Sequence, residues 1–263
     1  MCLYFFAYEC HPNYRLILAG NRDEFYHRPT EPAKFWDSHP WVLAGRDLEM
    51  MGTWMGVTKS GRFAALTNYR DPSLHIASGE SRGLLVSEFL CSEQPPAAYL
   101  QKVAEKRERY NPFNLLVGNL EQLYYINRLN PEILLLEPGI YGLSNHLLDT
   151  PWPKVQKTKQ ALAAYLKNRA FVEPGPIFEL LADTELAPDQ DLPSTGISKE
   201  REKALSSVFI PEPGYGTRSS TVLLINRHNE VFFQEKTFIN GREQGKEVQQ
   251  RFDIVSVHEP TKG

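Results

Sequence analysis

An asparagine, an arginine and two carboxylic acids stand together where the second apolar segment of the chain ends. The stretch 19–29 reads AGNRDEFYHRP and places six polar or charged side chains within eight residues: Asn21, Arg22, Asp23, Glu24, His27 and Arg28. Such a cluster has two interpretations. It is either a solvated turn in which opposite charges cancel, or the wall of a site that holds its charges for a reaction.

Cys2 is the second candidate for chemistry, because it directly follows Met1. A small second residue generally allows the initiator methionine to be removed, and the mature chain would then begin with a cysteine that carries a free α-amine. An α-amine ordinarily has a pKa of ~7.7–8.0 and a cysteine thiol one of ~8.5, so the amine can activate the thiol near neutral pH. If Met1 is retained, a different base is required, and Asp23 is a candidate.

A predicted hairpin brings these two features together. The apolar runs 2–9 and 14–20 flank CHPN, a turn rich in structure-breaking residues. Antiparallel pairing across this turn places the start of the first strand beside the end of the second, so Cys2 comes next to GNRDEF. There Arg22 would lower the pKa of the thiol, and a carboxylate such as Asp23 would orient the ammonium. The alternative is a set of surface ion pairs worth ~0–1 kcal/mol.

Three further polar residues stand at the ends of predicted strands. Asn68 ends the strand in AALTNYRDP, Asn145 ends the one in YGLSN, and Arg218 begins the one in RSSTVLLINR. Asparagine amides are suitable donors to an oxyanion, because they are neutral and fixed. Asparagine is also a common turn residue, which is the structural alternative at each position.

The elements that must position these residues alternate in type along the chain. Short runs rich in aromatic and β-branched residues predict strands up to residue 68, two helices follow from Ser81, and strands return between 113 and 145. The segment 151–170 predicts an amphipathic helix whose lysines form a solvated face. A proline-rich surface excursion over 171–217 precedes the last strands. This order predicts one α+β domain over residues 1–263, with helices covering its sheets.

Composition excludes several classes of protein. The net charge of −3 gives no global attraction for nucleic acid, and no apolar run reaches the ~20 residues of a membrane span. The N-terminus has no basic region of the kind that secretory signals carry, so we expect a cytoplasmic protein. Three cysteines without C-x-x-C spacing indicate neither a disulfide framework nor a metal site. The expected partner is a small molecule.

Seven ordered segments resemble the NRDE family, also called the transport and Golgi organisation protein two family. They are NRDEFYHRPTEPAKFW, LAGRDLEMMGTWMGVTKSGRFAALTNYRDP, SRGLLVSEFL, NPFNLLVGN, YGLSNHLLDTPWPKV, LSSVFI and YGTRSSTVLLI. The resemblance runs from Cys2 to about Glu235. It implies the N-terminal nucleophile (Ntn) hydrolase fold, a four-layer αββα sandwich of antiparallel sheets.

A more distant resemblance links the chain to the penicillin V acylase and bile salt hydrolase group. Carried over by motif, the catalytic residues of that group correspond to Cys2, Arg22, Asp23, Asn68, Asn145 and Arg218. An ungapped alignment of the opening motif would put Asn21 and Glu24 in the places of Arg22 and Asp23, and both registers stay open at this point.

Two functions follow from the resemblance. The first is an N-terminal-cysteine amidohydrolase that acts on a small amide or acyl compound and needs no cofactor. In it Cys2 attacks, Asn68 and Asn145 hold the oxyanion, and Arg22 and Arg218 favour the thiolate. The second is a binding or trafficking protein that uses the same cleft for haem or for a lipid or acyl-coenzyme A compound. The segment CHP at 10–12 is a weak candidate for a haem ligand, because it lies in a tight turn.

Overall fold

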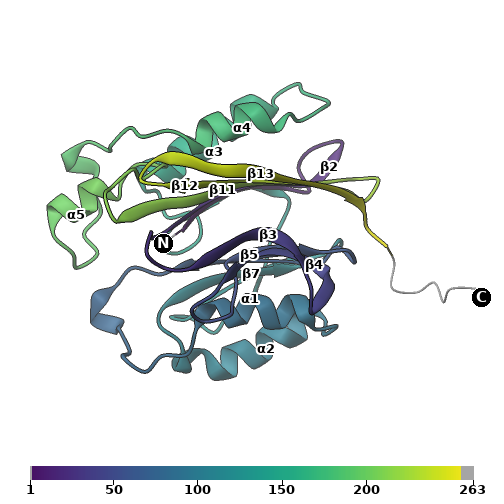
Figure 1. Ribbon diagram of the computed structural model, residues 1–263, viewed down its shortest axis with the longest axis horizontal. Coiled ribbons are helices and arrows are strands. Elements are labelled where there is room, and N and C mark those ends of the chain that lie inside the picture. The colour runs from purple at the N-terminus through teal and green to yellow at the C-terminus, as the bar shows by residue number, and fades with distance from the viewer. Residues whose placement is uncertain (1, 256–263) are drawn as a thin grey trace, which may run out of the picture.

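Strand β1 (Cys2–Tyr8) is buried along its whole length, as its sequence CLYFFAY allows, because no charged side chain interrupts it. The computed structural model describes residues 2–255, and in it β1 lies inside a sandwich of four layers. Helices form the outer layers and two antiparallel sheets form the inner layers (Figure 1). The N-terminal strand is therefore covered on both faces.

Over residues 2–255 the first sheet has six strands, and β1 lies within it rather than at an edge. In spatial order its strands are β10 (Gly139–Leu143), β1, β2 (Tyr14–Phe25), β11 (Tyr215–Asn226), β12 (Glu230–Ile239) and β13 (Arg242–Asp253). Only β1 and β2, and the run from β11 to β13, are neighbours in both sequence and space. The middle of this sheet thus joins segments about 200 residues apart in the chain.

The second sheet follows the chain order from strand to strand. Its strands within residues 2–255 are β3 (Thr30–Trp36), β4 (His39–Asp47), β5 (Met55–Thr58), β6 (Phe63–Asn68), β7 (Phe113–Gly118), β8 (Leu123–Asn127) and β9 (Leu134–Leu135). Side chains of alternate residues of β1, such as Tyr4 and Phe6, pack between the two sheets with Leu43 and Met55. This apolar layer holds the sheets face to face.

Two pairs of helices cover the outer faces (Figure 1). Helices α1 (Arg82–Cys91) and α2 (Pro96–Lys106) pack on the second sheet through residues such as Phe89 and Leu100. Helices α3 (Pro153–Leu166) and α4 (Pro174–Leu181) pack on the other face of the first sheet, where Leu162 and Ile177 belong to one apolar cluster with Phe5 of β1. The predicted αββα sandwich of antiparallel sheets is confirmed.

The remaining helices are short. They are α5 (Lys199–Ala204) and the 3-10 turns η1 (Pro72–Leu74), η2 (Arg107–Arg109) and η3 (Asp189–Asp191). Ser198 caps α5, because its hydroxyl accepts from the Arg201 N–H. Helix α5 belongs to the segment that leads from α4 back to β11 at Tyr215, at the left in Figure 1.

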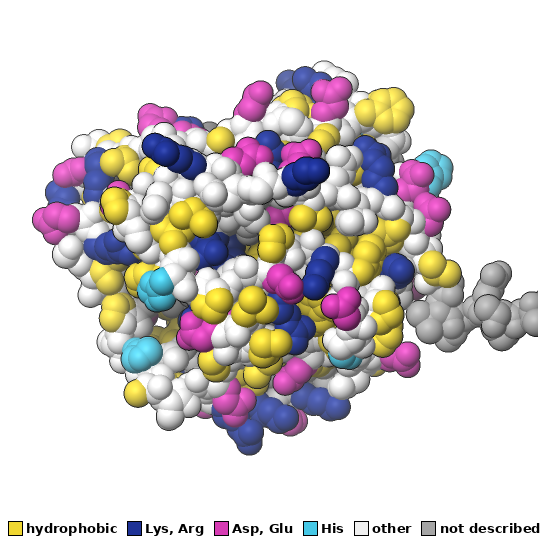
Figure 2. Space-filling model, viewed as in Figure 1, with side chains coloured by type: hydrophobic (Ala, Val, Ile, Leu, Met, Phe, Trp, Pro, Cys, Tyr) yellow, Lys and Arg dark blue, Asp and Glu magenta, His cyan; other side chains and the backbone are white. Residues whose placement is uncertain are grey.

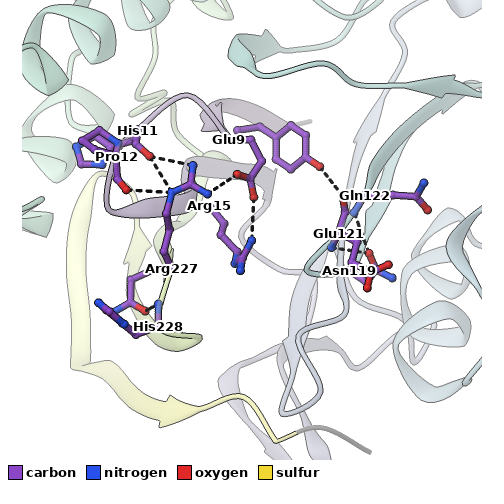
Figure 3. A network of polar contacts seen from close by, with 11 residues as sticks. Glu9, His11, Pro12, Arg15, Asn119, Glu121, Gln122, Arg227 and His228 are labelled. Atoms are coloured by element: carbon purple, nitrogen blue, oxygen red, sulfur yellow. Dashed lines mark hydrogen bonds and ion pairs between the residues drawn. The ribbon is translucent and has the colours of Figure 1, made fainter.

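The turn between β1 and β2 is fixed by side chains at the end of the hairpin remote from Cys2 (Figure 3). Arg227 donates to the carbonyl oxygens of His11 and Pro12 and pairs with Glu9 at 2.7 Å. Across the sandwich, the Tyr8 hydroxyl donates to the carbonyl of Glu121. These bonds anchor the hairpin to both sheets.

Strand β2 is longer than the sequence indicates. We expect a strand over 14–20, but it continues through NRDEF to Phe25, because β11 pairs with it as far as Tyr215 opposite Phe25. Pairing on both sides satisfies the backbone and lets polar side chains alternate between the two faces of a buried strand. Asn21 to Glu24 therefore do not form a solvated turn, whereas His27 and Arg28 lie in the turn that follows β2.

The prediction of a solvated lysine face on the helix at 151–170 is wrong for Lys154. Its side chain is 4% exposed, and its ammonium donates to the Leu205 carbonyl at 2.9 Å. Lys157, in contrast, is exposed and pairs with Asp183 and Glu185. Packing of α3 against β1 and the segment 205–208 turns Lys154 inward.

None of the helices within residues 2–255 is long and apolar enough to cross a bilayer. On the face shown in Figure 2, basic and acidic side chains are interspersed and neither sign gathers into a large patch.

Candidate active site

Cys2 stands directly opposite Arg22 in the ladder between β1 and β2. Paired residues of an antiparallel ladder point to the same face, and here that face looks toward the second sheet. The two residues line a cleft of about 480 Å³ together with Asp23, Glu24 and Asn68. We call this the Cys2 cleft. Its other walls come from the segment 47–54 and from residues 75–83, which lead into α1.

Arg22 is held by an aromatic ring and one hydroxyl. Its guanidinium lies 4.3 Å from the ring centroid of Trp54, and Nη1 donates to the Thr30 hydroxyl at 3.1 Å. The side chain is only 6% exposed, so the stacking on Trp54 partly replaces lost hydration. Arg22 is thus a fixed positive charge beside Cys2.

The structure distinguishes the two registers of the opening motif. The Asn21 amide points to the helix layer, where it donates to the carbonyls of Leu181 and Val208 and accepts from Ser220. Asn21 does not line the Cys2 cleft, whereas Arg22, Asp23 and Glu24 do. Of the two residues in the ungapped register, Asn21 and Glu24, only Glu24 lines the cleft.

Asp23 is buried beside the same strand end. One carboxylate oxygen accepts from the Thr217 hydroxyl at 2.8 Å. Burial raises the pKa of Asp23 above its usual value, while the ammonium of Lys154 and the Thr217 bond act in the opposite direction. A carboxylate with a raised pKa is a stronger base than an exposed one.

The thiol of Cys2 differs from the expectation of an arginine-stabilised thiolate. Burial raises its pKa, and the charges of Asp23 and Glu24 add to this effect, while Arg22 acts against it. Desolvation outweighs the single arginine because the thiol is 7% exposed. The protonated thiol therefore predominates near neutral pH, and any reaction needs a base.

The two asparagines predicted at strand ends occupy different positions. Asn68 is the last residue of β6 and lines the Cys2 cleft. Asn145 follows β10 at the level of Cys2, and its side chain is fully buried behind Asn68. The side-chain amide of Asn145 donates to the backbone carbonyl of Asn68 at 3.0 Å. Asn145 supports the strand end that carries Asn68.

Arg218 lies in a bulge of β11, on the far side of Arg22 from the Cys2 cleft. The ladder with β2 shifts register between Thr217 and Ser219, which leaves Arg218 out of the pairing. Its Nη1 donates to three backbone carbonyls of the segment 25–28. The residue thus anchors the exit from β2.

Sequence reasoning missed four residues near Cys2. Trp54 stacks on Arg22, and the Tyr4 hydroxyl contacts the Cys2 side chain and donates to the Trp54 carbonyl. Arg82 lines the cleft, and burial lowers its pKa. Burial also lowers the pKa of Lys154 to about 8. Only Tyr4, two residues from Cys2 on the same face of a strand, could have been found from spacing.

Cys2 and His75, two side chains that can ligate haem iron, line the cleft, but its other walls are unlike those of a haem pocket. The walls are strongly charged, whereas a porphyrin needs mainly apolar ones; the charged residues are Arg22, Arg28, Arg82, Asp23, Glu24, Asp47, Glu49 and Glu80. In the CHP turn both ring nitrogens of His11 form hydrogen bonds, one to the Arg169 carbonyl and one to the Asn13 N–H. Over residues 2–255 no three potential metal ligands gather at one point.

Comparison with known proteins gives a consistent family and fold. The family model described as Transport and Golgi organisation 2 matches residues 1–240. The Transport and Golgi organization protein 2 homologs of Bos taurus and Homo sapiens are 40% and 36% identical, covering 92% and 91% of this chain and 94% of each relative.

Among solved structures, a variant of the conjugated bile acid hydrolase from Clostridium perfringens superposes with a TM-score of 0.54. The match covers 99% of this chain and 100% of that one, at 9% sequence identity. At this identity the likeness shows the fold alone.

Proposed function

The chain belongs to the Transport and Golgi organisation 2 family and has an Ntn-hydrolase-like fold, and from this premise we propose that it is an N-terminal-cysteine hydrolase of a small amide or related acyl compound. One observation carries the proposal. Cys2 begins a fully buried strand and opens on a cleft in which Arg22, Asp23 and Asn68 lie around it. A surface turn would not need to bury these polar groups.

The proposed reaction has two steps. Once Met1 is removed, the α-amine of Cys2 takes the thiol proton, and sulfur attacks the carbonyl carbon of the substrate. The C–N bond breaks, the amine leaves with that proton, and a thioester remains on Cys2. Water, deprotonated by the same α-amine, then attacks the thioester and releases the carboxylic acid and the thiol.

The raised pKa of the Cys2 thiol supports an adjacent base in this reaction. An α-amine has a pKa of ~7.7–8.0, close enough to accept a thiol proton at neutral pH. The negative charge of Asp23 would hold that amine in place. If the mature chain keeps Met1, Asp23 is itself the candidate base, because burial raises its pKa.

The Asn68 side chain is the proposed oxyanion donor. It lines the cleft at the end of β6, and Asn145 holds the backbone at that point. Preorganised amide donors are worth ~10²–10³ in rate when they face a developing oxyanion. Asn145 is in this proposal a positioning residue.

Covalent labelling tests the proposal. In a Cys10→Ala background, which removes an exposed thiol outside the cleft, a thiol-directed acylating probe should label one site, Cys2. Adding Cys2→Ala should abolish that label together with turnover. The Cys91→Ala variant, which removes a partly buried thiol outside the cleft, should keep both. Labelling that survives in Cys2→Ala would refute the nucleophile.

An intact-mass measurement on the same samples gives the state of the N-terminus. Loss of ~131 Da, the mass of a methionine residue, together with labelling would support the α-amine as base. Reversible ligand binding without labelling or turnover would instead assign the cleft to a carrier.

A further inference from the structure

A second cavity lies behind Arg22 and Trp54, which separate it from the Cys2 cleft. It has a volume of about 180 Å³ and is bounded by β2, β3, β11 and β12, with Gln244 of β13 at its rim. Apolar walls come from Trp54, Pro32, Phe238 and Ile239. We call it the arginine cavity, because Arg22 and Arg218 both line it.

The two guanidinium groups face this cavity without a paired carboxylate. Within residues 2–255 neither Arg22 nor Arg218 has an acidic group within ion-pair distance, although the chain forms many such pairs elsewhere. Each arginine has its hydrogen bonds to described residues through Nη1. Burial lowers the pKa of Arg218, and the like charge of Arg22 lowers it further, while the more distant charge of Glu24 acts in the opposite direction without forming an ion pair. Two cations that repel one another in an enclosed space favour an anion between them.

Two acidic residues also line the cavity. Glu31 pairs with Lys34 at 3.1 Å, and the buried Glu235 bears on the type of anion. Glu235 is 1% exposed and already accepts from the Ala33 N–H at 2.7 Å and from the Thr221 hydroxyl. Burial raises its pKa to about 7, so near neutrality it carries a proton for much of the time and can donate a hydrogen bond. A monoanion tolerates this neighbour better than a dianion such as phosphate.

We propose that the arginine cavity binds the carboxylate group of a small ligand between Arg22 and Arg218. The apolar walls then contact the carbon atoms that carry the carboxylate. Planar guanidinium groups match a carboxylate because they offer paired donors. Because Arg22 stands opposite Cys2 and lines both cavities, a ligand whose carboxylate is held here reaches the Cys2 cleft only if it passes the stacked Arg22 and Trp54 side chains.

The consequence for the substrate rests on the proposed hydrolase function. The compound cleaved at Cys2 would be a small amide that carries a carboxylate a few bonds from its scissile carbonyl. Binding of a carboxylate, in contrast, is independent of any reaction and can be tested without one.

The test uses the full chain with Cys2→Ala, so that no turnover interferes. Acetate and propionate are titrated at constant ionic strength, with acetamide and propionamide as neutral analogues of the same shape. Trp54 fluorescence reports binding, and its signal is assigned with Trp54→Phe. We expect saturation by the carboxylates with a Kd of about 1–10 mM, as suits so small a ligand. The amides should give no saturable change, and phosphate should bind more weakly than acetate.

Variants of the two arginines locate the binding. Arg22→Met and Arg218→Met should each weaken acetate binding by about tenfold or more, the loss of one charged partner. Arg46→Met is the matched control, since Arg46 stacks on Trp36 at 4.0 Å away from the cavity, and it should bind acetate as the parent does. Circular dichroism checks that each variant is folded.

Equal responses to acetate and acetamide, or acetate binding that both arginine variants leave unchanged, would overturn the inference. The ligand comparison holds even if an arginine variant fails to fold. Labelling of Cys2 in the wild-type protein without acetate binding would reject the carboxylate site and leave the hydrolase standing. Acetate binding without labelling of Cys2 would support the carboxylate site and reject the hydrolase.

Discussion

Burial decides the chemistry of single side chains in this protein more than neighbouring charges do. Cys2, Asp23 and Glu235 all have pKa values raised by desolvation, although a cation acts on each of them. The hairpin predicted from the sequence places Arg22 beside Cys2, but it does not indicate how little water has access to the two side chains. The sequence therefore indicates the identity of the residues near the thiol better than their protonation.

Glu235 should make the stability of the protein depend on pH. Its pKa rises from 4.5 to about 7 on folding, so the folded state binds the proton more tightly than the unfolded state. This contribution is fully present below pH 4.5 and is lost as pH rises to about 7. At about 1.4 kcal/mol per pKa unit, the loss is about 2–4 kcal/mol.

The comparison of wild type with Glu235→Gln measures this effect. A glutamine keeps the acceptor for the Ala33 N–H but does not titrate, so its stability relative to wild type should rise with pH over that interval. Urea unfolding at a series of pH values gives the difference. Glu230→Gln, on the exposed start of the same strand, is the control, and parallel curves for wild type and Glu235→Gln would contradict the prediction.

At the scale of elements, a buried ion pair joins α5 to the end of β6. Arg70 pairs with Glu202, both nearly inaccessible, and also donates to the Asn145 side chain at 3.4 Å. Removing one partner leaves an uncompensated buried charge. Arg70→Met should therefore reduce the free energy of unfolding by about 3–5 kcal/mol and slow labelling of Cys2, because Asn145 loses a support.

The double variant Arg70→Met/Glu202→Gln separates charge from packing. It should regain part of the lost stability, because the glutamine at position 202 is neutral and its side-chain oxygen still accepts from the Thr195 N–H. Arg128→Met, which removes a pair with the exposed Glu108, should cost only about 0–1 kcal/mol. Equal losses for Arg70→Met and Arg128→Met in urea unfolding would refute the argument.

Close packing of Tyr4 on β2 depends on Gly20. A Cβ atom at Gly20 would lie 2.1 Å from the Tyr4 ring and 2.9 Å from the Leu3 carbonyl. Gly20→Ala should therefore cost about 1–3 kcal/mol through overpacking and should displace the Tyr4 hydroxyl from Cys2.

Gly175→Ala is the matched control for this substitution. A Cβ atom there meets nothing within 4 Å, in the first turn of α4, so alanine should leave stability unchanged or raise it by up to about 1 kcal/mol. Thermal unfolding of the two variants provides the measurement. A Gly20→Ala protein as stable as Gly175→Ala would show that Tyr4 has room to move.

Elements whose partners are close in sequence were the predictable ones. The hairpin of β1 and β2 follows from the CHPN turn, and it correctly places Cys2 beside Arg22. The pairing of β2 with β11 joins distant segments, so nothing local indicates that the strand continues to Phe25 or that Arg218 lies in a bulge. Lys154 was misjudged for the same reason, because its burial depends on the distant segment 205–208.

At the scale of the whole molecule, the site depends on the late strands. The end of β2, which carries Arg22 and Asp23, is paired on both sides only after β11 has joined the first sheet. A chain ending at residue 214 lacks β11 to β13, so it should neither fold cooperatively nor be labelled at Cys2. A chain ending at residue 241 lacks only β13, an exposed edge strand beyond the family match at 240.

That longer truncation should remain folded with a lower Tm and keep its Cys2 label. Circular dichroism on heating and labelling of both truncations supply the comparison. Labelling of the chain that ends at 214 would show that β11 is not needed to form the cleft.

The alternation of side chains along β2 also limits how this stretch can evolve. Arg22 faces the Cys2 cleft, while Asn21 bonds to the helix layer through Leu181 and Val208. An insertion or deletion of one residue between the turn and Asn21 would exchange these faces, turning the asparagine toward Cys2 and the arginine toward the helix layer. Substitutions can accumulate in this strand one at a time, whereas a change of length would disable both faces at once. Among relatives, length variation should therefore fall in the exit segment 26–29 and not within the strand.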